Sequence, residues 1–364
     1  MIVLRWLRAI VAIGPTFLLD AAGGRRVSSP AMRMHIALVG ALVLVTVGCG
    51  GGGDDDGTPP EPVTLTFVTP TVGARFVRDQ LEPTDGWRAA QVAVEVAATG
   101  APASIDLAAG DLALGAVGAD GRAEIVLIDG GPVTITATAR DAAGAALATA
   151  TVEVEVGDPD VANCRAWLDL YGITYTAGPA NQGVADPVTL TLPVNGVPFR
   201  YLTNTSRRNT FFMDCGLARS LVQAAPFFRS RGVVEVADIG VYNYRCIGTG
   251  TPPNCPNGMS QHAYARAIDL GAFVLADGTT YTLETDWVID PTTEKTCEAA
   301  TANEADAWLH DLICDIKGDD VWNIALTPNY NADHRNHFHV DLTAGSDFIR
   351  RQARAPMDDG ADDW

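Results

Sequence analysis

Histidine is scarce in this chain, and four of its six histidines gather where they could do chemistry. His334, His337 and His339 stand within six residues of one another, and His262 stands seven residues before Asp269. A hydrophobic core does not require imidazoles at this density, whereas Zn²⁺ binds imidazole nitrogen and carboxylate oxygen. The composition of these two segments therefore predicts a metal site.

Strand periodicity indicates how these side chains would meet. In an extended "HFHVDL" segment, His337, His339 and Asp341 share one face and apolar side chains share the other. In "AIDLGAF", Asp269 points away from its apolar neighbours by the same alternation. If the two strands are neighbours, Asp269 and His339 converge, and His262 can fold back from the preceding loop.

The donor set favours one kind of metal and one kind of site. Two imidazoles and one carboxylate, from His262, His339 and Asp269, suit a single Zn²⁺ per chain. Three protein ligands leave a fourth position for water, which is typical of catalytic zinc. The competing interpretation is that these residues are hydrogen-bonded polar groups of a core without metal.

The elements around these residues predict an α+β domain over residues 158–345, built on a small antiparallel sheet. Apolar spacing predicts helices in "DCGLARSLVQAAPFFRSRG" and "NEADAWLHDLICDIKG", the second of which carries His310. We expect strands in "VVEVADIGVYNYRC", "RAIDLGAFVL", "TTYTLE" and "HFHVDL". Asp277 and Gly278 form the predicted turn between the second and third strands.

Residues 63–157 have a different pattern. Short alternating apolar runs such as "VTITATA" and "TATVEVEV" are separated by Gly, Asp and Pro, without histidine or cysteine. They predict an all-β sandwich that resembles bacterial immunoglobulin-like surface modules. A spacer or adhesive role is the simplest interpretation. Flexible residues 50–62 precede this domain, and an acidic tail, 346–364, ends the chain.

Cysteine use and the N-terminal segment both predict export. A start at Met32 or Met34 gives Arg33, an apolar run and then Cys49, which resembles a bacterial lipoprotein signal within residues 1–49. The apolar run is short for a membrane-spanning helix. The cell envelope, with lipidation at Cys49, is therefore the expected location.

The other six cysteines are an even number, as disulfides in an oxidising compartment require. Nearness in sequence favours Cys246 with Cys255 and Cys297 with Cys314, which leaves Cys164 with Cys215. A cysteine zinc site is disfavoured because the chain has no CxxC pair. The formal net charge of −19 makes nucleic acid an unlikely partner.

Two segments carry a specific resemblance. "SQHAYARAID" and "DHRNHFHVD" resemble the extensin-like C-terminal domain family, over roughly residues 164–342, and that family looks related to zinc D-alanyl-D-alanine carboxypeptidases, murein endopeptidases and the hedgehog domain. The peptidase pattern S-x-H-x-x-G-x-A-x-D maps onto Ser260, His262, Ala267 and Asp269. Ala265 stands where that pattern has Gly.

The resemblance also supplies roles. The pattern H-x-x-H-x-H maps onto His334, His337 and His339, and "GYR" onto Tyr244 and Arg245. Either His337 or His334 would be the general base, with Asp333 as a third candidate. Arg245 would hold a substrate carboxylate or an oxyanion, or be an ordinary surface arginine.

Asp341 would orient an imidazole. These roles predict a zinc metallopeptidase that cleaves peptidoglycan peptides, because export places the domain beside that polymer. A binding or adhesion module that uses zinc only for stability is the alternative. A disulfide-built domain without metal is the third interpretation, which explains the convergent polar residues poorly.

Overall fold

The structure is a computed structural model, and it describes residues 61–204, 206–289 and 296–350. Cys49, the export signal and most of the acidic tail lie outside these ranges. No helix among the described residues is long and apolar enough to span a bilayer. The described chain divides into two compact units, 61–78 with 90–158, and 79–89 with 159–350.

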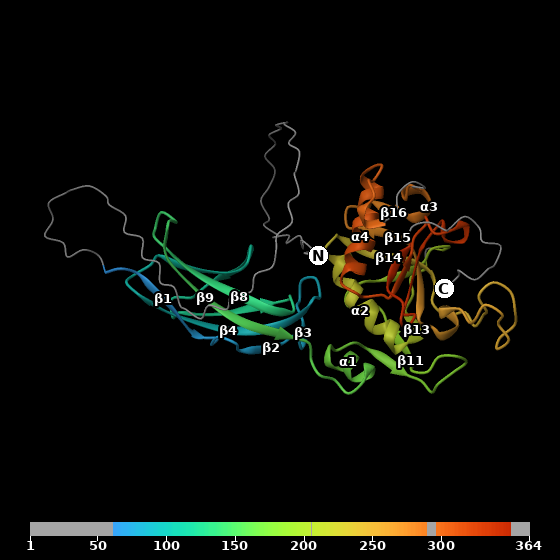
Figure 1. The fold of residues 1–364 in the computed structure, drawn as a ribbon, viewed down its shortest axis with the longest axis horizontal. Coiled ribbons are helices and arrows are strands. Elements are labelled where there is room, and N and C mark those ends of the chain that lie inside the picture. Colours follow the sequence, from blue (N-terminus) through green and yellow to red (C-terminus); the bar gives the residue numbers. More distant parts are fainter. Residues whose placement is uncertain (1–60, 205, 290–295, 351–364) are drawn as a thin grey trace. The chain divides into compact units, whose positions relative to one another are not determined.

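The first unit is all β, as its alternating apolar runs predicted. Its strands are β1 (Thr64–Thr69), β2 (Arg75–Val77), β4 (Arg88–Thr99), β5 (Ser104–Ala109), β6 (Leu112–Ala116), β7 (Arg122–Leu127), β8 (Gly131–Arg140) and β9 (Ala146–Gly157). One sheet pairs β4 with β1 and β7, and the other has the order β2-β9-β8-β5-β6 (Figure 1). Within residues 79–89 of the second unit, the short β3 (Gln80–Leu81) pairs with Arg88 and Ala89. Inward residues of both sheets form one core around Val92, Ile125, Ile135 and Val154.

The second unit mixes helices with two sheets (Figure 1). Its helices are α1 (Cys164–Leu170), α2 (Cys215–Arg229), α3 (Leu283–Asp286) and α4 (Glu304–Gly318), with short 3₁₀ turns η1 (Gln261–Tyr264), η2 (Thr296–Glu298) and η3 (Ala332–His334). A three-stranded sheet contains β10 (Tyr175–Ala177), β11 (Pro187–Thr191) and β13 (Thr210–Asp214). Asp214 caps α2 and Asn303 caps α4 through their side chains.

A seven-stranded sheet carries the predicted metal residues. It has the order β12-β14-β15-β18-β17-β19, with β16 also paired to β15. The strands are β12 (Phe199–Tyr201), β14 (Val233–Gly240), β15 (Ala267–Leu275), β16 (Thr280–Thr282), β17 (Ile324–Leu326), β18 (Phe338–Asp341) and β19 (Phe348–Arg350).

The sheet is therefore larger than the small one predicted, and it is antiparallel, as predicted, only among its inner strands. The strands β12 and β19 pair in parallel with β14 and β17 at the two edges. These two strands and β17 have three residues each, too few to show alternation in the sequence. In addition, β14 ends at Gly240 instead of continuing to Cys246, and β19 begins within residues assigned to the acidic tail.

One hydrophobic core fixes which face of this sheet the site occupies. Side chains of α1, α2 and α4 pack with Ile268 and Leu270 of β15 and with Phe338 and Val340 of β18. The alternate residues of these two strands therefore face away from the helices. This opposite face carries the predicted metal ligands, so core packing determines their orientation.

Three disulfides tie the second unit together, in the pairs that nearness in sequence favoured. They join Cys164 to Cys215, Cys246 to Cys255 and Cys297 to Cys314. The first links α1 to the beginning of α2, and the third links η2 to α4. Each closed loop reduces the conformational freedom of the unfolded chain.

Candidate metal centre

Strand register brings two of the predicted ligands face to face. The strands β15 and β18 are antiparallel neighbours in which Asp269 lies directly opposite His339. Their side chains share one face because directly opposed residues of a pair always do. Asp269 and His339 were expected to converge if these strands were neighbours, and β15 and β18 do pair.

The third predicted ligand, His262, comes from a loop. After β14 the chain makes an irregular excursion and returns through η1, which begins after Ser260 and contains His262. The Ser260 hydroxyl accepts the His262 backbone N–H at 3.3 Å, and the Asn243 backbone N–H donates to the His262 carbonyl at 3.1 Å. These bonds set the position of an imidazole that is only 4 % exposed.

Close packing stiffens this loop. The Cys246–Cys255 disulfide closes its outer part, and Gly183 of a neighbouring loop packs against it. A Cβ atom at Gly183 would lie 2.6 Å from the Ala263 carbonyl oxygen, so only glycine fits there. Ala265, at the position where the peptidase pattern has Gly, adopts a left-handed conformation with φ of 51°. That backbone explains the preference for Gly.

The three donor atoms form a compact triangle. His262 Nε2 lies 3.2 Å from Asp269 Oδ1 and 3.1 Å from His339 Nδ1, and His339 Nδ1 lies 3.0 Å from Asp269 Oδ1. Ligands about 2.0–2.2 Å from a tetrahedral zinc ion stand roughly 3.3–3.5 Å apart. The observed triangle is slightly tighter than this, and a shift of a few tenths of an ångström would accommodate the ion.

Hydrogen bonds on the far side of each ring decide which nitrogen faces the triangle. His262 Nδ1 lies 2.7 Å from the Val241 carbonyl oxygen, which can only accept, so this nitrogen carries the proton. His339 Nε2 lies 3.1 Å from a carboxylate oxygen of Asp341, which likewise accepts its proton. When both rings are neutral, each therefore directs a lone pair toward Asp269, and three electron pairs meet where a cation would sit.

The charges within the cluster shift the pKa values of His339 and Asp269 away from their usual values. Burial opposes protonation of His339, but the carboxylates of Asp269 and Asp341 outweigh it and raise its pKa to about 9. Burial alone would raise the pKa of Asp269, yet His262 and His339 hold it well below its usual value. The metal-free cluster thus retains a proton in the place of a cation.

The two candidate bases lie beside the triangle in different settings. His337 precedes β18, and its Nε2 is 3.5 Å from Asp269 Oδ1. The His334 ring centroid is 5.1 Å from that of His337, and its Nδ1 donates to Asn331 Oδ1 at 2.6 Å. Burial, with added repulsion from neighbouring imidazoles, lowers the pKa of His334 to about 3. Burial also lowers the pKa of His337, although Asp269 opposes that shift.

The remaining candidates are not in contact with the triangle. Arg245 is exposed, and only its backbone carbonyl is engaged, by the Ser260 N–H at 3.2 Å. This bond places its backbone beside η1, and among the described residues its guanidinium has no partner. Asp333 is exposed in η3, where its backbone N–H donates to Asn331.

A buried ion pair that was not predicted lies near Asp269. Arg208 forms two hydrogen bonds of 2.8 and 2.6 Å with the carboxylate of Asp238 on β14, beneath the ring of Tyr201. Burial, opposed by Arg208 and reinforced by the charge of Asp269, raises the pKa of Asp238 to about 6. No spacing pattern marks this pair, because Arg208 lies beside β12, where its N–H donates to the Phe199 carbonyl at 2.8 Å, and β12 in turn pairs with β14.

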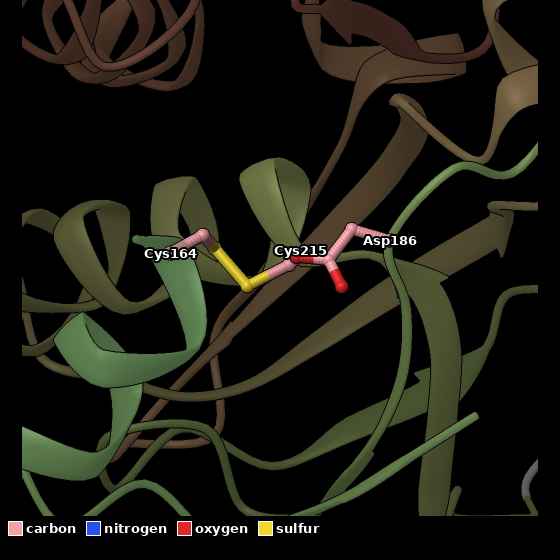
Figure 2. A group of neighbouring side chains, drawn as sticks. All are labelled: Cys164, Asp186 and Cys215. Carbon is pink, nitrogen blue, oxygen red and sulfur yellow. A yellow bond between two sulfur atoms is a disulfide. The ribbon is translucent and has the colours of Figure 1, made fainter. Parts of the chain in front are cut away.

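A second cluster also gathers metal-type residues. Cys164, Cys215 and Asp186 have donor atoms within 4.8 Å of one another, and Figure 2 shows the two sulfur atoms joined beside the carboxylate. A disulfide sulfur is not a thiolate ligand, and Asp186 pairs with Arg165 at 2.6 Å. This cluster is a covalent crosslink and does not bind metal in its oxidised form.

Comparison with known proteins identifies the second unit. No curated protein matches the chain. Among solved structures, fibronectin(III)-like modules of Clostridium thermocellum CbhA align with 16 % identity over 27 % of this chain and all of that one, at a TM-score of 0.22. Such a low score says nothing about the fold. The family model described as "Extensin-like protein C-terminus" matches residues 162–350, more than half of the chain, and the protein therefore belongs to the extensin-like C-terminal family.

Proposed function

We propose that the second unit is a zinc metallopeptidase of the cell envelope that hydrolyses peptidoglycan peptides. The observation that carries the proposal is the convergence of His262 Nε2, His339 Nδ1 and Asp269 Oδ1 within 3.2 Å of one another. Burying three lone pairs against one another is unfavourable unless a cation lies between them. Two nitrogens and one oxygen match the preference of Zn²⁺.

The residues around the three donor atoms also fit a zinc ion. Val241 and Asp341 hold the two imidazoles by the outer nitrogens, an arrangement that typically fixes zinc ligands. Three protein ligands are the usual number at catalytic zinc, whereas structural sites use four. When bound, zinc supplies Lewis acidity for the attack of water on a peptide carbonyl.

Of the two candidate bases, His337 is the better placed. Its Nε2 points at the triangle from 3.5 Å, so it can take a proton from a water that attacks beside Asp269. His334 is held by Asn331, and its pKa of about 3 makes it a poor proton acceptor. We therefore assign His337 as the general base. His334 packs beside it, where it would exclude water and limit rotation of the His337 ring.

Arg245 has the freedom that substrate binding needs. It is exposed beside the loop that carries His262, and a free guanidinium can bind a carboxylate by paired hydrogen bonds. We therefore propose that Arg245 binds the terminal carboxylate of a peptide or the developing oxyanion. The lipoprotein-like signal supports a location next to the wall, with the β-rich first unit as an immunoglobulin-like spacer or adhesive module.

One observation favours a second candidate function, that of a zinc-stabilised binding module. His337 Nε2 is near enough to the triangle to become a fourth ligand after a small shift, and it would then close the site. A closed site stabilises the fold but activates no water. The exposed loops around the site would then form a recognition surface.

The experiment combines metal analysis with turnover. The purified chain should hold one zinc ion, and it should release fragments from peptidoglycan peptides that mass spectrometry identifies. His337→Ala should retain zinc while turnover falls by roughly 10²–10⁴, the usual contribution of general acid–base catalysis. His334→Ala is the matched control on the same segment, and we expect a smaller loss.

Zinc binding without hydrolysis of any wall peptide would refute the enzyme and favour the binding module. If His337→Ala also lost zinc, then His337 would be a ligand and the closed site would be correct. If His334→Ala showed the large loss with full zinc content and His337→Ala did not, then the assignment of the base would be reversed.

A further inference from the structure

A cavity of about 220 Å³ opens beside α4 and has no part in the proposed reaction. His310 and Asp306 line it from the helix, and the segments 288–289 and 300–302 form the other walls. Trp287 separates it from the sheet: its ring lies 5.3 Å from Phe338, a core residue on the face opposite the metal residues. This cavity and the metal centre are therefore different sites.

The imidazole of His310 is the unusual feature of this cavity. Its side chain is buried, with 5 % of the residue exposed, and Trp287 stacks on the ring at 3.8 Å. Its Nδ1 lies 2.9 Å from the Asp306 carbonyl oxygen, which can only accept, so Nδ1 donates. In the neutral ring Nε2 is then an acceptor, and no described residue hydrogen-bonds to it.

The carboxylate of Asp306, which also lines the cavity, accepts two backbone N–H groups. One oxygen of Asp306 accepts the Val288 N–H and the other accepts the Ala302 N–H, each at 2.9 Å. The remaining walls are mostly apolar, and Val288 and Ile289 are 38 % and 39 % exposed. The lining therefore offers one unfilled acceptor, His310 Nε2, beside the Asp306 carboxylate and the Thr301 hydroxyl, and its other side chains are apolar.

The walls are also held in place before any ligand enters. The Cys297–Cys314 disulfide joins η2 to α4, and the Asn303 side chain caps the helix between the two walls. The carboxylate of Asp306 ties both segments to the same helix through the bonds described above. A preorganised cavity loses little entropy on binding.

We propose that this cavity binds a compact aromatic ring bearing one N–H or O–H group, of the indole or phenol class, which donates to His310 Nε2. An apolar cavity of about 150 Å³ is known to bind benzene, so the larger volume here admits one or two fused rings. The ring could be a free aromatic compound or the side chain of tryptophan or tyrosine in a peptide. In either form, the ligand supplies the donor that the buried imidazole lacks.

Matched ligands test the donor. Calorimetry with the full chain should show indole and phenol binding about tenfold more tightly than 1-methylindole and anisole, which fill similar space without a donor. The Nε2 resonance of His310 in ¹⁵N-edited NMR should shift with indole and with phenol, but not with 1-methylindole or anisole. Tighter binding of N-acetyltryptophanamide or N-acetyltyrosinamide would identify a peptide source, and tighter binding of the simple rings a free compound.

Matched variants test whether the ligand binds in this cavity. Ala300→Trp should block the cavity and weaken indole binding at least tenfold, whereas Ala143→Trp, an exposed alanine of the first unit, should not. His310→Phe keeps a ring for Trp287 to stack on and should abolish the preference for indole over 1-methylindole. Absence of saturable binding by every probe, equal affinity with and without the donor, or full binding by Ala300→Trp would each overturn the proposal.

Discussion

Two clusters in the second unit each bring three metal-type donors together, and they differ in what those donors are bonded to. At Cys164, Cys215 and Asp186 the sulfurs are bonded to each other and the carboxylate is paired with an arginine. At His262, Asp269 and His339 the outer atoms of the rings are engaged and the inner atoms are left facing one another. Proximity of suitable residue types is therefore insufficient to make a metal site. Whether the donor atoms are already bonded to other groups decides whether they can bind a metal.

The largest expected effect tests this contrast directly. His339→Ala removes one of three ligands, and the remaining two hold zinc poorly, so metal content should fall from one ion per chain to nearly none. Asp186→Asn in the other cluster should leave zinc content unchanged. Elemental analysis after dialysis against a weak chelator measures both. Retention of zinc by His339→Ala would show that the ion lies elsewhere.

A smaller effect is expected from the partner of a ligand. Asp341 is fully buried and accepts from His339 Nε2, so Asp341→Asn should weaken zinc affinity by roughly 10–100-fold, the usual effect of removing such a partner. Competition with a fluorescent zinc chelator gives the affinity. Equal affinity in the variant and the wild type would mean that Asp341 serves folding alone.

The pH dependence follows from the raised pKa of His339, which is about 9 in the metal-free cluster. At pH 7 zinc must displace this proton, so binding should release about one proton, and affinity should rise with pH until about pH 9. Calorimetry in buffers of different ionisation enthalpy counts the protons. A pH-independent affinity between pH 6 and 8 would contradict the assignment.

The raised pKa of His339 has the opposite effect on the stability of the metal-free fold, which should fall as pH rises. A histidine with a folded pKa above its unfolded value of about 6.5 stabilises the protein fully below that value. This contribution should be lost as pH rises from about 6.5 through about 9. Urea unfolding with a chelator should therefore give a lower free energy at pH 9.5 than at pH 6.5, and zinc should remove the difference.

The smallest expected effect concerns the loop behind His262. Ala265→Gly removes the strain of an alanine in the left-handed conformation, but it also removes a buried methyl group. Because these two contributions nearly cancel, the free energy of unfolding should change by less than about 1 kcal/mol. Gly183→Ala is the contrasting variant, because its Cβ would strike the Ala263 carbonyl. Thermal unfolding should show a clear loss only for the second. A large gain in Ala265→Gly would mean that strain dominates there.

The two compact units show a related difference. The first is held by the apolar faces of two sheets, and its inward residues are almost all valine, isoleucine, leucine or alanine. The second buries His262, Asp341 and the Arg208–Asp238 pair, and carries all three disulfides. Alternation of apolar residues specifies the first kind of core. Buried polar groups in the second kind need partners that are distant in the sequence.

The sequence by itself determined the residues of the candidate metal centre and the elements that carry two of them. The scarcity of histidine marked the ligands, alternation placed Asp269 and His339 on one face of their strands, and the cysteine order gave the observed pairs. Local periodicity suffices for such statements because it depends only on neighbouring residues. Family membership followed from two short segments and is confirmed.

Only the tertiary structure decided the rest. The edge strands β12, β17 and β19 are too short to have a period, so the sheet could not be sized from the sequence. The tautomers of His262 and His339 depend on Val241 and Asp341, and the first of these is a backbone carbonyl that no residue type reveals. Likewise, the Arg208–Asp238 pair and the unfilled acceptor of His310 arise from packing between distant segments, whose geometry no local pattern encodes.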